Sequence, residues 1–182
     1  MTDMLKIGGR LALICAVAAL CLGAVNAVTE PKIDAARVEK LQNALAQVSP
    51  GGTIGEEVLV DDAVVESYYK LDDNGKTIGY ILNLKGSGYG GDLIILAGFL
   101  SDGTLYNTVL MEDDETPGLG KEAEKASYMK KYLGFSGSNI PSAKSQLDQT
   151  EADAISGASI TFTGIGKALE AGSVYVTEME GK

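Results

Sequence analysis

The segment Asp153–Thr161 combines small residues with hydroxyl-bearing residues. Small residues allow a backbone to approach a ligand closely, and four hydroxyls could meet a phosphate, those of Ser156, Ser159, Thr161 and Thr163. A helix that begins near Thr161 would add unpaired N–H groups and the positive end of its dipole, which favour an anion. Ser and Thr are also preferred N-cap residues, so an ordinary helix cap is the alternative interpretation.

A second segment, Glu115–Gly120, contains Pro117 and two glycines. Proline fixes its own φ and glycine removes the side chain, so this composition predicts a tight, irregular loop that a flat ligand can approach closely. An ordinary turn before the next helix would have the same composition. Taken alone, the acidic run Glu112–Glu115 that leads into the loop is typical of a solvated acidic surface.

A third segment, Gly86–Gly91, matches the spacing G-x-G-x-x-G. In dinucleotide-binding proteins a helix opens at the last glycine, and its N-terminus receives the pyrophosphate. Here a short apolar, strand-like run within Asp92–Leu100 follows instead, so the spacing does not predict dinucleotide binding.

Composition excludes several functional classes. Histidine is absent, which removes Ser-His and Cys-His nucleophile pairs and most catalytic zinc sites. The two cysteines, Cys15 and Cys21, lie in one apolar stretch and predict no disulfide framework. The formal net charge is −10, of which residues 1–28 contribute +1 and the rest −11. An acidic body of this kind is a poor partner for nucleic acid or for an anionic lipid surface.

Residues Leu11–Val28 form an uncharged apolar run preceded by Lys6 and Arg10. At ~1.5 Å per residue such a helix would cover roughly the hydrocarbon thickness of a bilayer. We expect an uncleaved membrane anchor, with a signal peptide cleaved after Ala27 as the alternative. In both cases the basic residues stay on the cytoplasmic side, which predicts that the rest of the chain is extracytoplasmic.

The remaining elements follow from periodicity and from turn residues. A helix is expected to start at Thr29–Pro31 and to end at Pro50–Gly52, and the pattern changes to β from Val58. We expect two hairpins, a helix, a weakly patterned stretch and a final helix. Their ranges are Val64–Leu71 with Thr77–Leu84, Leu93–Leu100 with Thr104–Met111, Lys121–Leu133, 136–150, and within Thr161–Glu180. Hairpins flanked by helices predict an α+β domain with a mostly antiparallel sheet.

The segment Asp153–Ser159 reads D-x-x-S-G-A-S and resembles the flavinylation motif of the FMN-binding domain family, D-x-x-(S/T)-G-A-(T/S). Gly88–Gly91 and Glu115–Gly120 also match segments of that family in the same order. Together with the apolar N-terminal helix, the resemblance spans nearly the whole chain. Within the family the sequence is most similar to a subunit of Rnf-type electron-transport complexes, and the sodium-translocating NADH:quinone reductases share the motifs in a longer chain.

The resemblance implies covalent FMN, joined by a phosphoester bond to Ser159. The family usually has threonine at this position, and Thr161 is the competing acceptor. The resemblance also implies that eight further residues contact the cofactor: Ser156, Gly157, Ala158, Thr161, Glu115, Thr116, Gly118 and Leu119. Asp153 would serve recognition by a flavin transferase. No catalytic acid, base or metal ligand is expected.

We therefore expect four parts: a cytoplasmic N-terminus (1–10), a transmembrane anchor (11–28), a helical connector (29–50) and an extracytoplasmic FMN-binding domain (51–182). The implied function is electron transfer within a membrane complex that couples it to ion translocation. The partners would be integral-membrane and redox subunits of an Rnf-type complex. A free-standing anchored flavoprotein and a non-redox binding module are the alternatives.

Overall fold

The computed structural model describes residues 2–155 and 157–181. The chain divides into two compact units, Met1–Leu41 and Gln42–Lys182. Ser156, one of the expected phosphate partners, lies outside the described residues.

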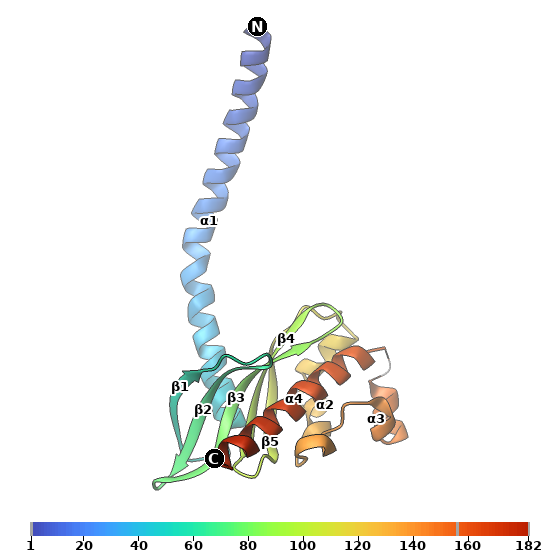
Figure 1. The fold of residues 1–182 in the computed structure, drawn as a ribbon. Coiled ribbons are helices and arrows are strands. Elements are labelled where there is room, and N and C mark those ends of the chain that lie inside the picture. The colour runs from blue at the N-terminus through green and yellow to red at the C-terminus, as the bar shows by residue number, and fades with distance from the viewer. Residues whose placement is uncertain (1, 156, 182) are drawn as a thin grey trace. The chain divides into compact units, whose positions relative to one another are not determined.

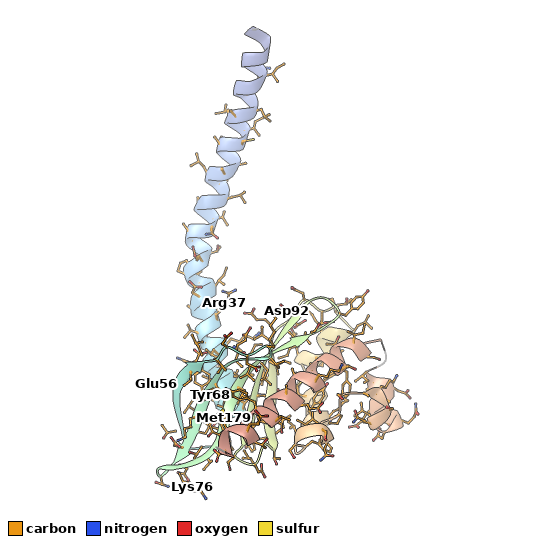
Figure 2. The ribbon with its side chains drawn as sticks, in the orientation of Figure 1. Arg37, Glu56, Tyr68, Lys76, Asp92 and Met179 are labelled. Atoms are coloured by element: carbon orange, nitrogen blue, oxygen red, sulfur yellow. The ribbon has the colours of Figure 1, made fainter. Side chains whose placement is uncertain are left out.

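The first unit is part of one long helix, α1, Thr2–Val48 (Figure 1). From Ile7 onward α1 is long and apolar enough to cross a membrane, and large apolar side chains between Ile7 and Val38 are exposed (Figure 2). The predicted helix over Leu11–Val28 is therefore confirmed as a helix.

The separate helix start that we expected at Thr29–Pro31 is wrong, because α1 continues through Pro31. A proline removes one backbone hydrogen bond, but the helical pattern continues on both sides of it. The Thr29 hydroxyl also donates to the Val25 carbonyl oxygen one turn earlier, at 3.0 Å. Thr29 therefore bonds back into a continuous helix instead of capping a new one.

Five strands form one antiparallel sheet in chain order, β1-β2-β3-β4-β5. They are β1 (Thr53–Leu59), β2 (Val65–Asp73), β3 (Lys76–Ser87), β4 (Asp92–Leu100) and β5 (Leu105–Glu112). Both predicted hairpins are confirmed, and the β2–β3 turn has positive φ at Asn74 and Gly75, as two-residue hairpin turns require. β1 begins at Thr53, before Val58, where we expected the β pattern to start. The sequence did not show this start because the edge strand is exposed along most of its length and lacks the apolar alternation of a half-buried strand.

The chain after β5 forms short helical turns: η1 (Gly120–Glu124), α2 (Ala126–Met129), η2 (Lys130–Tyr132), η3 (Gly137–Asn139) and η4 (Lys144–Gln146). The continuous helix predicted over Lys121–Leu133 is wrong, because Lys125 is extended, with φ −79° and ψ 131°. Ala123 and Tyr128 are both buried, and on one ideal helix they would point about 140° apart. The break at Lys125 allows both to face the core.

Two helices close the chain, α3 (Gln149–Ala154) and α4 (Ser159–Glu180). α3 was not predicted and overlaps the weakly patterned stretch 136–150 only at its first two residues. Asp148 caps α3 by accepting the Glu151 N–H at 2.8 Å. α4 confirms the predicted final helix and lies across one face of the sheet (Figure 1). Its buried residues Ile165, Leu169 and Val176 belong to the main core cluster.

The opposite face of the sheet receives the end of α1. Ala44 and Val48 are buried, and a Cβ at Gly98 of β4 would collide with the Val48 carbonyl oxygen. The Asn107 side-chain amide donates to the Gln47 carbonyl oxygen at 2.9 Å. The sheet therefore has helices on both faces, and the expected α+β class is confirmed.

Candidate functional site

The first turn of α4 carries an exposed serine hydroxyl and no side-chain cap. The helix begins at Ser159, which is exposed, and its N-cap residue is Ala158, which makes no side-chain cap hydrogen bond. Alanine at this position costs ~1 kcal/mol relative to Ser, Thr, Asp or Asn. N–H groups at a helix start attract anions because they lack intrahelical acceptors and carry the positive end of the dipole. The start of α4 is thus suited to an anion on or beside Ser159.

A buried carboxylate connects this helix start to two other segments. Glu115 is 4% exposed and accepts hydrogen bonds from the backbone N–H groups of Tyr89, at 2.7 Å, and Gly90, at 3.2 Å. Its second oxygen, Oε2, accepts the hydroxyl hydrogen of Thr161 at 2.9 Å. Glu115 is therefore not part of a solvated acidic loop, as its run alone suggested, because three donors compensate its burial.

Glycines allow the β3–β4 hairpin tip and the loop after β5 to pack directly against Asp114 and Glu115. A Cβ at Gly88 or at Gly120 would collide with the Glu115 carboxylate, and one at Gly90 would collide with the Asp114 carbonyl oxygen. The glycines at the tip of the β3–β4 hairpin are therefore needed for packing against Asp114 and Glu115. This packing accounts for the G-x-G-x-x-G spacing although a strand, and not a helix, follows it.

Aromatic residues pack against the first turns of α4. Tyr132 and Phe162 stack with ring centroids 5.0 Å apart, and the Tyr132 hydroxyl donates to the Phe162 carbonyl oxygen at 3.0 Å. Burial raises the pKa of Tyr128 and of Tyr132, with the charge of Glu115 a second cause at Tyr128. Both tyrosines are therefore neutral packing residues at physiological pH.

A cavity of about 530 Å³, the Glu115 cavity, lies between the hairpin tip, the loop after β5 and the start of α4. Tyr89, which is 74% exposed, Leu119 and Ile160 give it large apolar surfaces. Its other lining residues are Glu115, Thr116, Gly120, Gly157, Ala158, Ser159 and Thr161. Its volume is typical of small-molecule sites, which span roughly 300–1,000 Å³.

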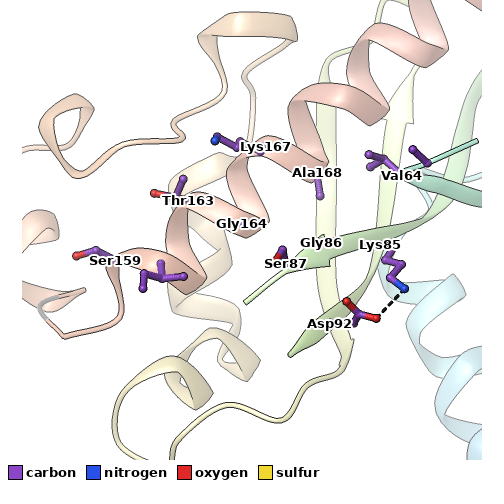
Figure 3. Close-up of a pocket in the computed structure, with 12 residues that line it drawn as sticks. Val64, Lys85, Gly86, Ser87, Asp92, Ser159, Thr163, Gly164, Lys167 and Ala168 are labelled. Carbon is purple, nitrogen blue, oxygen red and sulfur yellow. Dashed lines mark ion pairs between the residues drawn. The ribbon is translucent and has the colours of Figure 1, made fainter. Parts of the chain in front are cut away.

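A second cavity of about 660 Å³, the Lys167 cavity, lies along α4 (Figure 3). Its lining includes Ser159, Thr163 and Lys167 from α4 and Lys85 and Asp92 from the β3–β4 hairpin. Ser159 and Ile160 line both cavities, so the exposed serine hydroxyl stands where the two meet.

The structure brings together most of the residues that the sequence singled out. Seven of them line the Glu115 cavity: Glu115, Thr116, Leu119, Gly157, Ala158, Ser159 and Thr161. Gly118 is not in this lining, although its positive φ of 78° shapes the loop. The sequence interpretation did not select Tyr89, Ile160 or Lys167. Tyr89 could have been found from its position inside the glycine-rich motif, but nothing in the sequence marks Lys167.

The fold and this site define an FMN-binding domain protein with an N-terminal apolar helix. Residues 88–173 match the FMN-binding domain family, and residues 1–48 match the family described as the RnfG N-terminal region. The first match contains the hairpin tip, the Glu115 loop and the start of α4.

Curated relatives extend the match over nearly the whole chain. The G subunit of the ion-translocating oxidoreductase complex of Methanosarcina acetivorans is 29% identical over 98% of this chain and 97% of its own length. The protein of the same name from Cereibacter sphaeroides strain ATH 2.4.9 is 30% identical over 85% of this chain and 75% of its own. The G subunit of the proton-translocating ferredoxin:NAD(+) oxidoreductase complex of Clostridium ljungdahlii is 25% identical over 94% of this chain and 91% of its own length. The chain belongs to the family of these G subunits.

The residues of the site fit the FMN that the family binds. The uncapped start of α4 offers N–H groups to a phosphate, and the Glu115 cavity offers apolar surface to a flat ring system. FMN is thus the cofactor that the family match and the site both support.

Proposed function

We propose that this chain is a covalently flavinylated electron-transfer subunit of a membrane complex that couples electron transfer to ion translocation. The observation that carries the proposal is the exposed hydroxyl of Ser159, which stands at the uncapped start of α4 and borders the Glu115 cavity. When bound, FMN supplies the redox centre, which accepts electrons and passes them on. The protein anchors the cofactor and shapes its surroundings.

Ser159 is a better attachment residue than Thr161 for a structural reason. Thr161 is 1% exposed, and its hydroxyl donates to Glu115. Attachment there would break that bond and bring a phosphate against a buried carboxylate, whereas attachment at Ser159 preserves it. Thr161 would then support the phosphate end indirectly, through Glu115.

The attachment step requires an activated flavin donor. The Ser159 Oγ–P bond forms as Oγ loses its proton, and the bond between that phosphorus and its leaving group breaks. A flavin nucleotide whose phosphate is part of a phosphoanhydride has such a leaving group, which is the other phosphate of the anhydride. That phosphate leaves with the electron pair of the broken bond, and the Ser159 proton passes to it or to solvent. A flavin transferase would catalyse this exchange. Asp153, which is exposed and accepts a hydrogen bond from the Gln149 side chain at 2.9 Å, is accessible for recognition by that enzyme.

The ring or the ribityl chain of FMN would lie in the Glu115 cavity. Leu119 and Ile160 offer apolar contacts there, and Thr116 and the glycines leave room for a flat ligand. Electron transfer of this kind requires a held flavin near a partner's redox centre, so no general acid or base is assigned.

The complex is inferred from the relatives, whose names describe subunits of ion-translocating oxidoreductases. As part of such a complex the chain would belong to an enzyme, with integral-membrane and redox subunits as its partners. α1 would cross the membrane once, with Lys6 and Arg10 on the cytoplasmic side and the FMN domain outside. Between Leu11 and Val28 the only ionisable side chains are two thiols, so this helix offers no path for a cation.

The attachment is tested on full-length protein purified from membranes of a flavinylating host. Flavin fluorescence should survive denaturation in the wild type and in Ser159→Thr and be absent in Ser159→Ala, because only the first two carry a hydroxyl at this position. Peptide mass spectrometry locates the flavin, and flavin on Thr161 or Thr163 would show that our register is wrong.

The role in the complex is tested by the same alanine variant in the assembled complex. Ser159→Ala should leave the complex assembled and stop electron-coupled ion transport. Full coupled transport without flavin on this subunit would refute the redox role. Purification of the wild-type chain without integral-membrane partners would favour a free-standing flavoprotein.

A further inference from the structure

Three polar side chains follow one another along α4 from the attachment residue. Ser159, Thr163 and Lys167 are spaced four residues apart, so they share one face of the helix. Figure 3 shows them on successive turns, with the two hydroxyls and the lysine ammonium directed toward the start of α4. All three line the Lys167 cavity, which Ser159 also joins to the Glu115 cavity.

The two lysines of this cavity differ in their electrostatic partners. Lys85 pairs with Asp92, with Nζ and Oδ2 2.6 Å apart, so a carboxylate already neutralises its charge. No ion pair of Lys167 is found among the residues whose side chains the structure describes, 7–155 and 157–181. In a chain with a formal charge of −10, a lysine without a carboxylate partner beside a cavity is available to an anionic ligand.

We propose that Thr163 and Lys167 hold the phosphate of the flavin attached to Ser159. This inference rests on the proposed attachment. The Cα atoms of Thr163 and Lys167 lie about 6 and 12 Å along the axis from that of Ser159, and helical side chains lean toward the N-terminus. The Thr163 hydroxyl donates to a phosphate oxygen, and the flexible four-carbon stem of Lys167 brings its ammonium toward the remaining negative charge.

This arrangement divides the cofactor between the two cavities. The phosphate, bonded to Ser159, lies where the two cavities meet, between the uncapped start of α4 and Lys167. The ring or the ribityl chain lies on the Glu115 side. Lys167 then recognises the phosphate and not the flavin ring, so it discriminates FMN from riboflavin.

A titration of full-length flavin-free protein tests that discrimination. In the Ser159→Ala background, Lys167→Gln should weaken FMN binding about three- to tenfold, measured by quenching of flavin fluorescence, and leave riboflavin binding unchanged. Thr163→Val should weaken FMN binding about twofold. Lys76→Gln removes the same charge from the distant β2–β3 turn (Figure 2) and should change neither affinity. Equal effects of Lys167→Gln on both flavins, or no effect on FMN, would overturn the inference.

A second test measures how fast each lysine of the full-length protein is acylated, with mass spectrometry as the readout. It shows whether the attached flavin protects Lys167, without a measurement of non-covalent binding. Lys167 should react several-fold more slowly in flavinylated wild type than in Ser159→Ala, whereas Lys76 should react equally in both. A flavinylated Ser159 peptide with an unprotected Lys167 would overturn this inference alone. A Ser159 peptide without flavin would overturn the proposed function, and this inference with it.

Discussion

Replacing Glu115 with alanine should loosen three segments at once. The change removes the acceptor of two backbone N–H groups and of the Thr161 hydroxyl. Water can reach the N–H groups of Tyr89 and Gly90, because both residues are exposed, but Thr161 is 1% exposed. An unsatisfied buried hydroxyl costs ~1–3 kcal/mol and each replaced backbone bond ~0.5 kcal/mol. We therefore expect Glu115→Ala to lower the free energy of unfolding by about 2–4 kcal/mol.

Two further variants separate the causes. Glu115→Gln keeps the volume and one acceptor oxygen, so we expect a loss of only about 1 kcal/mol. Thr161→Val removes a single donor with little change of shape, and its effect should not add to that of Glu115→Ala, because the two share one hydrogen bond.

Urea unfolding of full-length protein in detergent, followed by tyrosine circular dichroism, measures these energies. All 8 tyrosines lie between residues 68 and 175, so the signal reports the domain and not the apolar helix. A loss below about 0.5 kcal/mol for Glu115→Ala, the size of an ordinary surface substitution, would refute the view that Glu115 ties these segments together.

Two other substitutions test the packing and the pH dependence. Gly164→Ala should cost about 1–3 kcal/mol in the same urea assay despite the better helix propensity of alanine, because its Cβ would collide with the Ser87 carbonyl oxygen. Glu178→Ala, at an exposed position of the same helix, should cost almost nothing, and equal costs of the two variants would contradict this explanation. Burial, with Glu57 second, raises the pKa of Tyr69 from 10.0 to about 12. The folded state therefore favours the neutral hydroxyl, and the resulting stability, complete below pH 10, should decline as the pH rises toward 12. Tyr69→Phe should weaken that alkaline loss, and an unchanged pH profile would rule out Tyr69 as its source.

Local patterns were sufficient to predict the hairpins and the final helix. Apolar alternation and the Asn74-Gly75 turn identify β2 and β3 because both signals depend on neighbouring residues only. The break at Lys125 was not predictable in this way, since it arises where Ala123 and Tyr128 both meet the core. β1 was only partly predicted, because an exposed edge strand has no buried face to produce a pattern.

The site shows the same division between local and long-range information. The segment Asp153–Thr161 has a local composition that indicates an anion site. The role of Glu115 depends on donors 25, 26 and 46 residues away, which no spacing rule relates to it. The contribution of Lys167 to a cavity was likewise invisible until the helix and the β3–β4 hairpin were placed together.

Because Glu115 bonds to two other segments, the cavity forms only when three segments of the chain have folded together. The hairpin tip, the loop after β5 and the first turn of α4 meet at one carboxylate, so no one of them can build the cavity alone. An incompletely folded chain presents the Ser159 hydroxyl without the walls that surround it. A transferase that requires those walls would attach flavin only to folded domains. Bound flavin would then indicate that this part of the chain had reached its native state.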